Sequence, residues 1–125
     1  MIDGEVIAID VNALDWNERR LPDSGKPMYG KRIFQDTDTD MSVGMIRYPA
    51  GTINPHHTHP CGHGFYVLQG TLVTHQGQYG PGSFVWFPEG GHMTHGASAE
   101  GDVVALFVTN KSFQIDYVDT PAKGS

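Results

Sequence analysis

The sequence lacks the features that mark several classes of protein. Its 125 residues contain one cysteine, Cys61, which excludes an intrachain disulfide framework. No apolar run approaches the roughly 18 residues of a membrane span, and the first ten residues carry no positive charge, so we expect no signal peptide. Lys and Arg number 8 against 14 Asp and Glu, which leaves no basic surface for nucleic acid or anionic lipid. We therefore expect a soluble, cytoplasmic protein.

The composition favours a single all-β domain. The length fits one domain, and 16 Gly with 8 Pro, spread without a period, indicate many turns. No segment shows a helical period over 11 or more residues, whereas short β-like runs recur between turn signals. These runs cover residues 4–11, 29–34, 42–48, 65–69, 71–75, 83–87, 103–109 and 113–118. We predict a β-sandwich or barrel.

The remaining segments are expected to be irregular. Residues 12–27 are predicted to form a loop with one helical turn over 13–20, and residues 119–125 a frayed tail. Residues 36–40 read DTDTD, but they lack the glycine and the distal Glu of a calcium loop, so we interpret them as a solvated turn.

Charge and histidine are unevenly distributed. No Asp or Glu occurs from Met41 through Pro88, and Arg47 is the one Lys or Arg in that stretch. All seven histidines lie between His56 and His95. The pattern is explained either by a buried β core with incidental histidines or by a metal site made of imidazole alone.

Two blocks of sequence carry the candidate ligands. In the first, residues 51–70, His57 and His59 are two apart, so on a strand they share one face, and His63 follows after a turn. The second, residues 82–96, adds a histidine from a distant strand. Imidazole suits Fe, Ni, Cu and Zn, and three or four imidazoles with an open position are typical of a catalytic site.

The spacing of these blocks resembles the cupin superfamily, small jelly-roll β-barrels with a metal in the barrel mouth. The first cupin motif is matched from Gly51 through His57 and His59 to Gly70, with His63 where most of the family has Glu. The second motif is matched at Gly82, Pro88 and Gly90, but its histidine position holds Met93. Within the superfamily the ending His95-Gly96 is most similar to the branch of acetylacetone-cleaving dioxygenases and ChrR-type anti-sigma factors.

The resemblance implies an organisation and a ligand set. It implies one cupin domain over residues 1–125, with the barrel core at about 42–110 and an N-terminal strand and loop at 1–41. It also implies a divalent transition metal held by His57, His59, His63 and His95. Fe(II) is favoured, with Zn, Ni or Mn as alternatives. Strand parity places His95 on the family's ligand face and His92 on the other, although a bulge at Gly90-Gly91 would bring in His92 instead.

Each residue also has a plainer interpretation. His57 and His59 would be surface residues in a metal-free cupin, and His63 a hydrogen-bond donor behind the ligands. His56 and His75 are expected at the surface. Arg47 would pair with an anionic substrate or, as we favour, lie exposed on a strand.

Neutral imidazoles leave a divalent ion its full charge, which favours binding an enolate or carboxylate. The proton acceptor would be metal-bound hydroxide, His92 or a tyrosine. We expect a small-molecule dioxygenase that acts on a β-dicarbonyl or hydroxyketone. The alternatives are a non-redox isomerase, cyclase or lyase, and a metal- or ligand-sensing domain without turnover.

By analogy with other cupins we expect a homodimer, with residues 4–11 as an edge strand.

Overall fold

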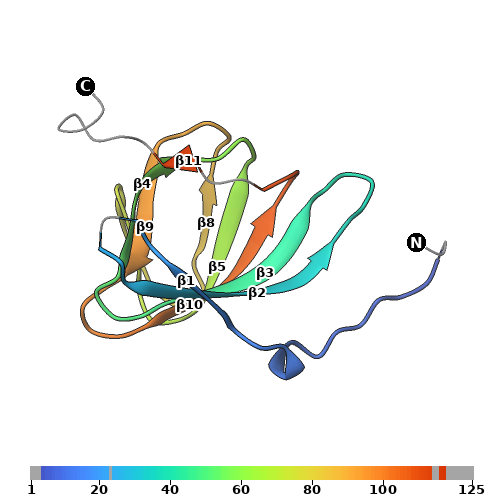
Figure 1. Ribbon diagram of the computed structural model, residues 1–125, viewed down its shortest axis with the longest axis horizontal. Coiled ribbons are helices and arrows are strands. Elements are labelled where there is room, and N and C mark those ends of the chain that lie inside the picture. Colours follow the sequence, from blue (N-terminus) through green and yellow to red (C-terminus); the bar gives the residue numbers. More distant parts are fainter. Residues whose placement is uncertain (1–3, 23, 114–115, 118–125) are drawn as a thin grey trace.

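Two antiparallel sheets face each other and enclose the core (Figure 1). The computed structural model describes residues 4–22, 24–113 and 116–117. The six-stranded sheet has the order β1 (Asn17–Arg20), β2 (Pro27–Gln35), β3 (Ser42–Tyr48), β10 (Val103–Thr109), β5 (His63–Gln69) and β8 (Phe84–Phe87). The five-stranded sheet has the order β11 (Asp116–Tyr117), β4 (Ile53–Thr58), β9 (Met93–Ala97), β6 (Leu72–Thr74) and β7 (Gly77–Tyr79). The all-β prediction is confirmed.

Several predicted strands agree closely with the observed ones. Residues 42–48 and 103–109 are strands β3 and β10 with the predicted bounds. The predicted strand at 65–69 begins two residues earlier, at His63, and the one at 29–34 extends to Pro27–Gln35. The DTDTD segment forms a turn, in which the Asp36 carboxylate accepts a hydrogen bond from the Asp38 amide at 2.8 Å.

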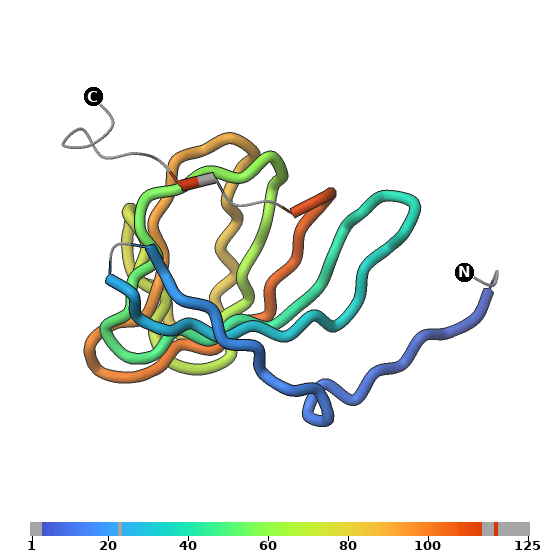
Figure 2. The backbone as a smooth tube through the Cα atoms, viewed as in Figure 1, coloured from blue at the N-terminus to red at the C-terminus, as the bar shows by residue number. Residues whose placement is uncertain are grey.

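The N-terminal predictions were wrong. Residues 4–11 do not form a strand, because no described strand lies beside them to accept their hydrogen bonds. They run extended away from the barrel, as Figure 2 shows, and end in a 3₁₀ turn, Val11–Ala13. The helical turn expected over 13–20 is replaced by strand β1, which pairs with β2.

The C-terminal predictions are tested only in part. Strand β11 lies within the predicted run at 113–118, but residues 114, 115 and 118 fall outside the described residues, as does the predicted tail at 119–125.

The core forms because strand side chains alternate between two faces. In β5, Phe65 and Val67 are fully buried between the sheets, whereas Tyr66 and Leu68 point outward. Residues from both sheets complete the cluster: Tyr48, Leu72, Phe87, Met93, Ala97, Val103 and Ala105. The side chains that face inward at one end of this core are those that build the candidate site.

A glycine allows the chain to pass from one sheet to the other. Gly70 follows β5 and has a φ of +78°, in the left-handed region that favours glycine. A Cβ at this position would collide with the carbonyl oxygen of Asp102. The final glycine of the first motif is therefore required both by the backbone turn and by the close packing of the neighbouring loop.

No helix among the described residues is long and apolar enough to cross a bilayer.

The N-terminal segment leads to a prediction about assembly. Val6 is 91% exposed, and Ile7 and Ile9 are also exposed, so three aliphatic side chains lack apolar cover. We expect a second copy of the chain to cover them in a homodimer, because exposed apolar segments favour association. Val6→Asp combined with Ile7→Asp should shift the protein to a monomer in size-exclusion chromatography with light scattering. Thr39→Asp, in an exposed turn, is the control. A monomeric wild type would contradict the prediction.

Candidate metal centre

The candidate centre forms where β4 and β9 pair. His57 lies in β4, His59 directly follows that strand, and His95 lies in β9. Asn54 is opposite His95 and His57 is opposite Met93, with an irregularity in the register between the two pairs. This pairing brings together histidines that are 38 residues apart in the sequence.

Gly96 makes the close pairing of these strands achievable. A Cβ on Gly96 would collide with the carbonyl oxygen of Thr52 and lie 2.6 Å from the Cα of Ile53. Real Cβ atoms do not approach a backbone this closely, so any other residue would push β9 away from β4. The glycine that follows His95 therefore fixes how near His95 comes to His57.

His57, His59 and His95 form a compact group of buried imidazoles. One ring nitrogen of each lies within 4.8 Å of the corresponding nitrogens of the other two. The side chains are almost fully buried, with at most 3% exposure. The Nε2 atoms of His57 and His95 are 3.0 Å apart, and the rings of His57 and His59 are 4.8 Å apart and nearly perpendicular.

Hydrogen bonds to the other ring nitrogens orient two of these imidazoles. Nδ1 of His57 lies 2.6 Å from the carbonyl oxygen of Pro55. A carbonyl only accepts, so Nδ1 carries the proton and Nε2 presents its lone pair to the group. Nδ1 of His95 lies 3.0 Å from the Tyr48 hydroxyl, which in turn accepts a hydrogen bond from the Asn54 amide at 3.1 Å. Hydrogen bonds of this kind are the usual supports of metal-binding histidines.

Burial keeps these imidazoles neutral. Desolvation, together with the charges of neighbouring histidines, lowers the pKa of His57 to about 4 and that of His63 to about 3. The pKa of His95 is lowered well below its ordinary value by the same two causes. Because a metal ligand must be unprotonated, the donor set fits a divalent transition metal at neutral pH.

His63, the remaining residue of the predicted ligand set, lies beside the group. Its ring is 4.4 Å from that of His59 and is stacked on Phe87 at 5.0 Å. It is fully buried, and within the described part of the chain neither ring nitrogen makes a hydrogen bond of good geometry, although the backbone of Cys61 lies near enough to raise the pKa slightly. Such a group is expensive to bury unless something binds it, so ligation by His63 remains a reasonable prediction.

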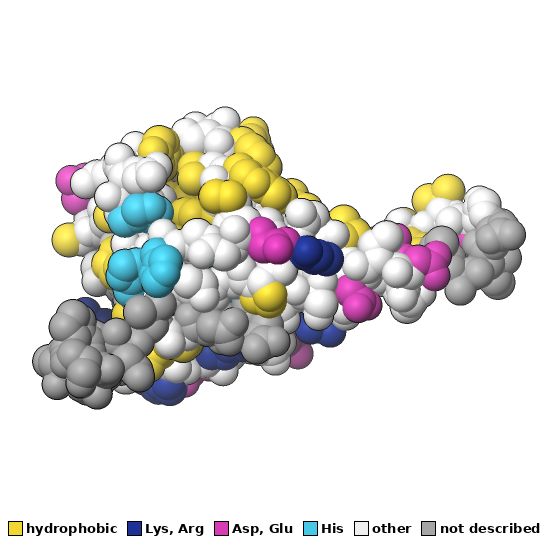
Figure 3. All heavy atoms as spheres, turned by 90° about the horizontal axis from the view of Figure 1, so that it is seen from above, with side chains coloured by type: hydrophobic (Ala, Val, Ile, Leu, Met, Phe, Trp, Pro, Cys, Tyr) yellow, Lys and Arg dark blue, Asp and Glu magenta, His cyan; other side chains and the backbone are white. Residues whose placement is uncertain are grey.

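The other histidines lie away from the group. His56, His75 and His92 are exposed, and Figure 3 shows histidine side chains at the surface of the barrel, at the end opposite the N-terminal segment. The rings of His56 and His92 contact each other at 5.1 Å. The structure thus brings His95 to the centre and places His92 at the surface.

Arg47 does not line the cavity beside the centre. Its guanidinium lies 4.5 Å from the ring centroid of Tyr29 and 5.5 Å from that of Trp16. It therefore stabilises the packing of these rings on the outer side of the sheet, and does not reach a substrate.

A cavity of about 480 Å³ opens beside the centre. His59 and His95 form part of its wall, together with the rings of Phe65, Phe107 and Phe113. Tyr48 and Asn54 supply its buried polar atoms. This volume lies in the range of small-molecule sites, and the wall combines aromatic rings with polar and cationic residues.

Sequence reasoning missed Tyr48, Asn54 and Tyr117. The ring of Tyr117, in β11, lies 5.7 Å from that of His57. Tyr48 and Tyr117 reach the site through pairing between strands distant in sequence, so no local spacing marks them. Asn54 lies on β4, three positions before His57, but its place beside Tyr48 and His95 depends on the packing of other strands.

A family model described as the ChrR Cupin-like domain matches residues 5–114. The chain belongs to this family. It is a cupin, and the resemblance seen in the sequence is confirmed. No curated protein matches the chain.

Solved structures share the cupin fold. The polyketide cyclase RemF from Streptomyces resistomycificus is 17% identical with a TM-score of 0.76, and the match covers 93% of this chain and 87% of that one. An RmlC-like cupin from Ralstonia eutropha JMP134 is 21% identical with a TM-score of 0.75, over 92% and 73% of the two chains. A chain of the complex of SigE with the anti-sigma ChrR from Rhodobacter sphaeroides is 20% identical with a TM-score of 0.63, over 80% and 51%.

Removal of the Tyr48 hydroxyl should weaken metal binding. Tyr48→Phe deletes the hydrogen bond that orients His95, and loss of such a support lowers metal affinity by about 10–100-fold. Competition with a chromophoric chelator for Co(II) or Zn(II) measures the effect. Tyr29→Phe is the matched control, because its hydroxyl bonds to Glu18 outside the centre. Equal affinities for Tyr48→Phe and the wild type would show that this hydrogen bond does not support the site.

The metal-free protein should lose stability as the pH falls. The pKa values of His57 and His63 are lower when folded than when unfolded, so the unfolded chain binds more protons between about pH 6.5 and the folded values. The free energy of unfolding is therefore highest above about pH 6.5 and declines towards pH 4. Each of these histidines contributes a decline of up to about 1.4 kcal/mol for every pH unit. Urea denaturation at several pH values tests this. His57→Asn should flatten the profile, whereas His75→Gln should not, because His75 is exposed.

Proposed function

We propose that this cupin is a metal-dependent enzyme that acts on a small β-dicarbonyl or hydroxyketone bound as its enolate. The metal would be held by His57, His59 and His95, with His63 as a fourth ligand. Fe(II) and a dioxygenase reaction are favoured. The observation that carries the proposal is the group of three buried, neutral imidazoles, with donor atoms within 4.8 Å, beside a cavity of about 480 Å³.

The donor set favours an anionic substrate. A divalent ion there would bind the enolate oxygens as a Lewis acid and, as iron(II), would provide the redox chemistry of a dioxygenase. None of the described residues that line the cavity is an Asp or Glu. The protein therefore places no negative charge in the cavity wall to oppose an enolate, and imidazole ligands leave the charge of the ion undiminished.

Hydrogen bonds beside the ligands can serve the substrate as well. When Nε2 of His95 is a ligand, its proton lies on Nδ1, which then donates to the Tyr48 hydroxyl oxygen. The Asn54 amide donates to the same oxygen, so the hydroxyl proton of Tyr48 is left to donate to another acceptor. Because Tyr48 lines the cavity, a substrate oxygen is a suitable acceptor.

The aromatic rings in the cavity wall support the proposal because they make part of the cavity apolar. Phe65 and Phe107 pack at 5.1 Å, and Phe113 packs on Phe107 at 5.0 Å. These rings limit the access of water and hold the hydrocarbon part of a substrate. Exclusion of water strengthens the attraction between an enolate and the cationic centre.

A non-redox cyclase or lyase is the second candidate. The fold similarity to the polyketide cyclase RemF, at a TM-score of 0.76, favours it. A centre that stabilises an enolate suits that chemistry equally well. Membership of the ChrR Cupin-like family keeps a sensing domain without turnover as a further outcome of the experiment.

Reconstitution with Fe(II) without oxygen, followed by substrate and then oxygen, tests the proposal. We expect about one iron per chain, and uptake of oxygen together with cleavage of pentane-2,4-dione or a related diketone. His57→Ala and His95→Ala should lose the metal, whereas His75→Ala, at the surface, should retain it.

The other outcomes separate the candidates. Turnover with Zn(II) or Ni(II) and without oxygen would favour the cyclase or lyase. Stoichiometric metal without turnover of any diketone or hydroxyketone would favour the sensor. Absence of metal after reconstitution would refute a metal-dependent function.

A further inference from the structure

The residues that line the cavity include cations and no described acid, although the protein as a whole is acidic. Arg19, Arg20, Lys31 and Arg32 are among the lining residues. The head group of Arg20 turns to Glu18 on the outer face, and the ammonium of Lys31 turns to Trp16 and the carbonyl of Val11, so the charged groups of these two residues do not face the cavity. The four lining cations are half of the chain's 8 Lys and Arg, and no Asp or Glu is among the described lining residues. With a net charge of -6 for the whole chain, this segregation of charge creates a local field that attracts anions.

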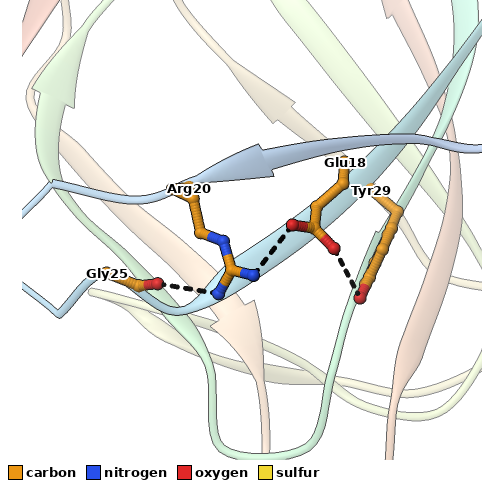
Figure 4. A network of polar contacts seen from close by, with 4 residues as sticks. All are labelled: Glu18, Arg20, Gly25 and Tyr29. Atoms are coloured by element: carbon orange, nitrogen blue, oxygen red, sulfur yellow. Dashed lines mark hydrogen bonds and ion pairs between the residues drawn. The ribbon is translucent and has the colours of Figure 1, made fainter.

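Arg19 lies on the inner face of β1, with its side chain exposed at the open edge of the cavity. In the pairing of β1 with β2 it is directly opposite Met28, which packs against the core, so the two side chains share the inner face. Figure 4 shows Glu18 and Arg20 together with Tyr29, joined by an ion pair of 2.9 Å and hydrogen bonds. Because neighbouring strand residues alternate, Arg19 lies on the opposite face from this network.

The other three cations already have partners. Arg20 also donates to the carbonyl oxygen of Gly25, at 3.2 Å. The ammonium of Lys31 donates to the carbonyl oxygen of Val11 at 3.1 Å, and Arg32 donates to the Gln35 side chain at 3.1 Å. Within the described part of the chain, no ion-pair partner is found for Arg19. Its guanidinium is therefore available to a ligand.

Arg19 lies on the side of the cavity near the histidines. Arg19, Tyr117, His59 and His95 all line the cavity, and the charge of Arg19 opposes the rise in the pKa of the Tyr117 hydroxyl that burial causes. The ring of Tyr117 contacts that of His57 at 5.7 Å. Arg19 and Tyr117 thus line the cavity on the side where the Tyr117 ring meets that of His57.

Gly30 leaves part of the cavity open because it has no side chain to fill it. Gly30 is opposite Ile46, which packs against the core, so it shares the inner face with Arg19. The nearest atom to a Cβ built on Gly30 is the carbonyl oxygen of Met45, at 3.6 Å, an ordinary contact. A larger side chain would fit the backbone at Gly30 but would occupy the cavity.

We propose that the substrate is a small organic carboxylate whose carboxylate group pairs with Arg19 while its keto or enolate oxygens face His57, His59 and His95. Its hydrocarbon part would lie along Phe65 and Phe107. This inference rests on the proposed function, because it concerns the part of the same substrate that lies away from the metal centre and assigns that part to Arg19. A planar guanidinium suits the role, since it can form two parallel hydrogen bonds to a carboxylate.

A matched pair of ligands tests the assignment. Calorimetric titration of the Zn(II)-loaded protein uses 4,6-dioxoheptanoic acid, a β-diketone with a remote carboxylate, and its neutral methyl ester. We expect the acid to bind at least about tenfold more tightly than the ester, as charge-assisted hydrogen bonds predict. Arg19→Gln should remove this preference and leave the affinity for the ester unchanged. Arg20→Gln, a neighbouring cation on the outer face, should retain the preference.

The outcomes distinguish this inference from the proposed function. If both ligands bind equally to the wild type, or if Arg19→Gln keeps the preference for the acid, the role of Arg19 is wrong although diketone binding stands. If neither ligand binds, diketone binding fails, and titration of hexanoate into the metal-free protein then decides on Arg19 alone. If hexanoate binds to the wild type, and binds more weakly to Arg19→Gln and in added salt, the anion site at Arg19 is supported. If hexanoate does not bind to the wild type, the anion site is refuted.

Discussion

The close pairing of β9 with β4 is the constraint on which the candidate centre depends. Gly96 allows the two backbones to approach, and the register sets Asn54 opposite His95. A slip of one residue would turn His95 to the other face of its strand. His95 would then leave both His57 and the Tyr48 hydroxyl, so the ligand group and its hydrogen-bond support depend on the same strand pairing.

Burial gives the centre its chemical character. An exposed imidazole is partly protonated near neutral pH, whereas desolvation keeps His57, His63 and His95 neutral with their lone pairs available. The protein gives up some stability for this, because His63 lies buried among aromatic rings without a hydrogen bond of good geometry in the described chain. Such an arrangement is typical of sites that bind a ligand, since the ligand supplies the missing interaction.

The features that follow from local periodicity could be predicted from the sequence. The two-residue spacing of His57 and His59 and the parity of His95 place these side chains correctly relative to their own strands. Features that depend on pairing could not be predicted in this way. Tyr48 and Arg19 reach the cavity through β3 and β1, and no spacing links them to the histidines. Residues 4–11 have a strand-like composition, but a strand also requires a neighbour with which to pair.

The absence of acidic residues from Met41 through Pro88 now has a physical explanation. This stretch supplies the six strands β3 to β8, and residues of β3, β4 and β5 form much of the wall around the histidines. A carboxylate there would either compete for the metal or repel an anionic substrate. The cations of the cavity come instead from β1 and β2, outside this stretch. The ligands and the cations thus come from different parts of the chain. Under the proposed function, the strands around the histidines would determine the chemistry and β1 and β2 the charge that the substrate meets.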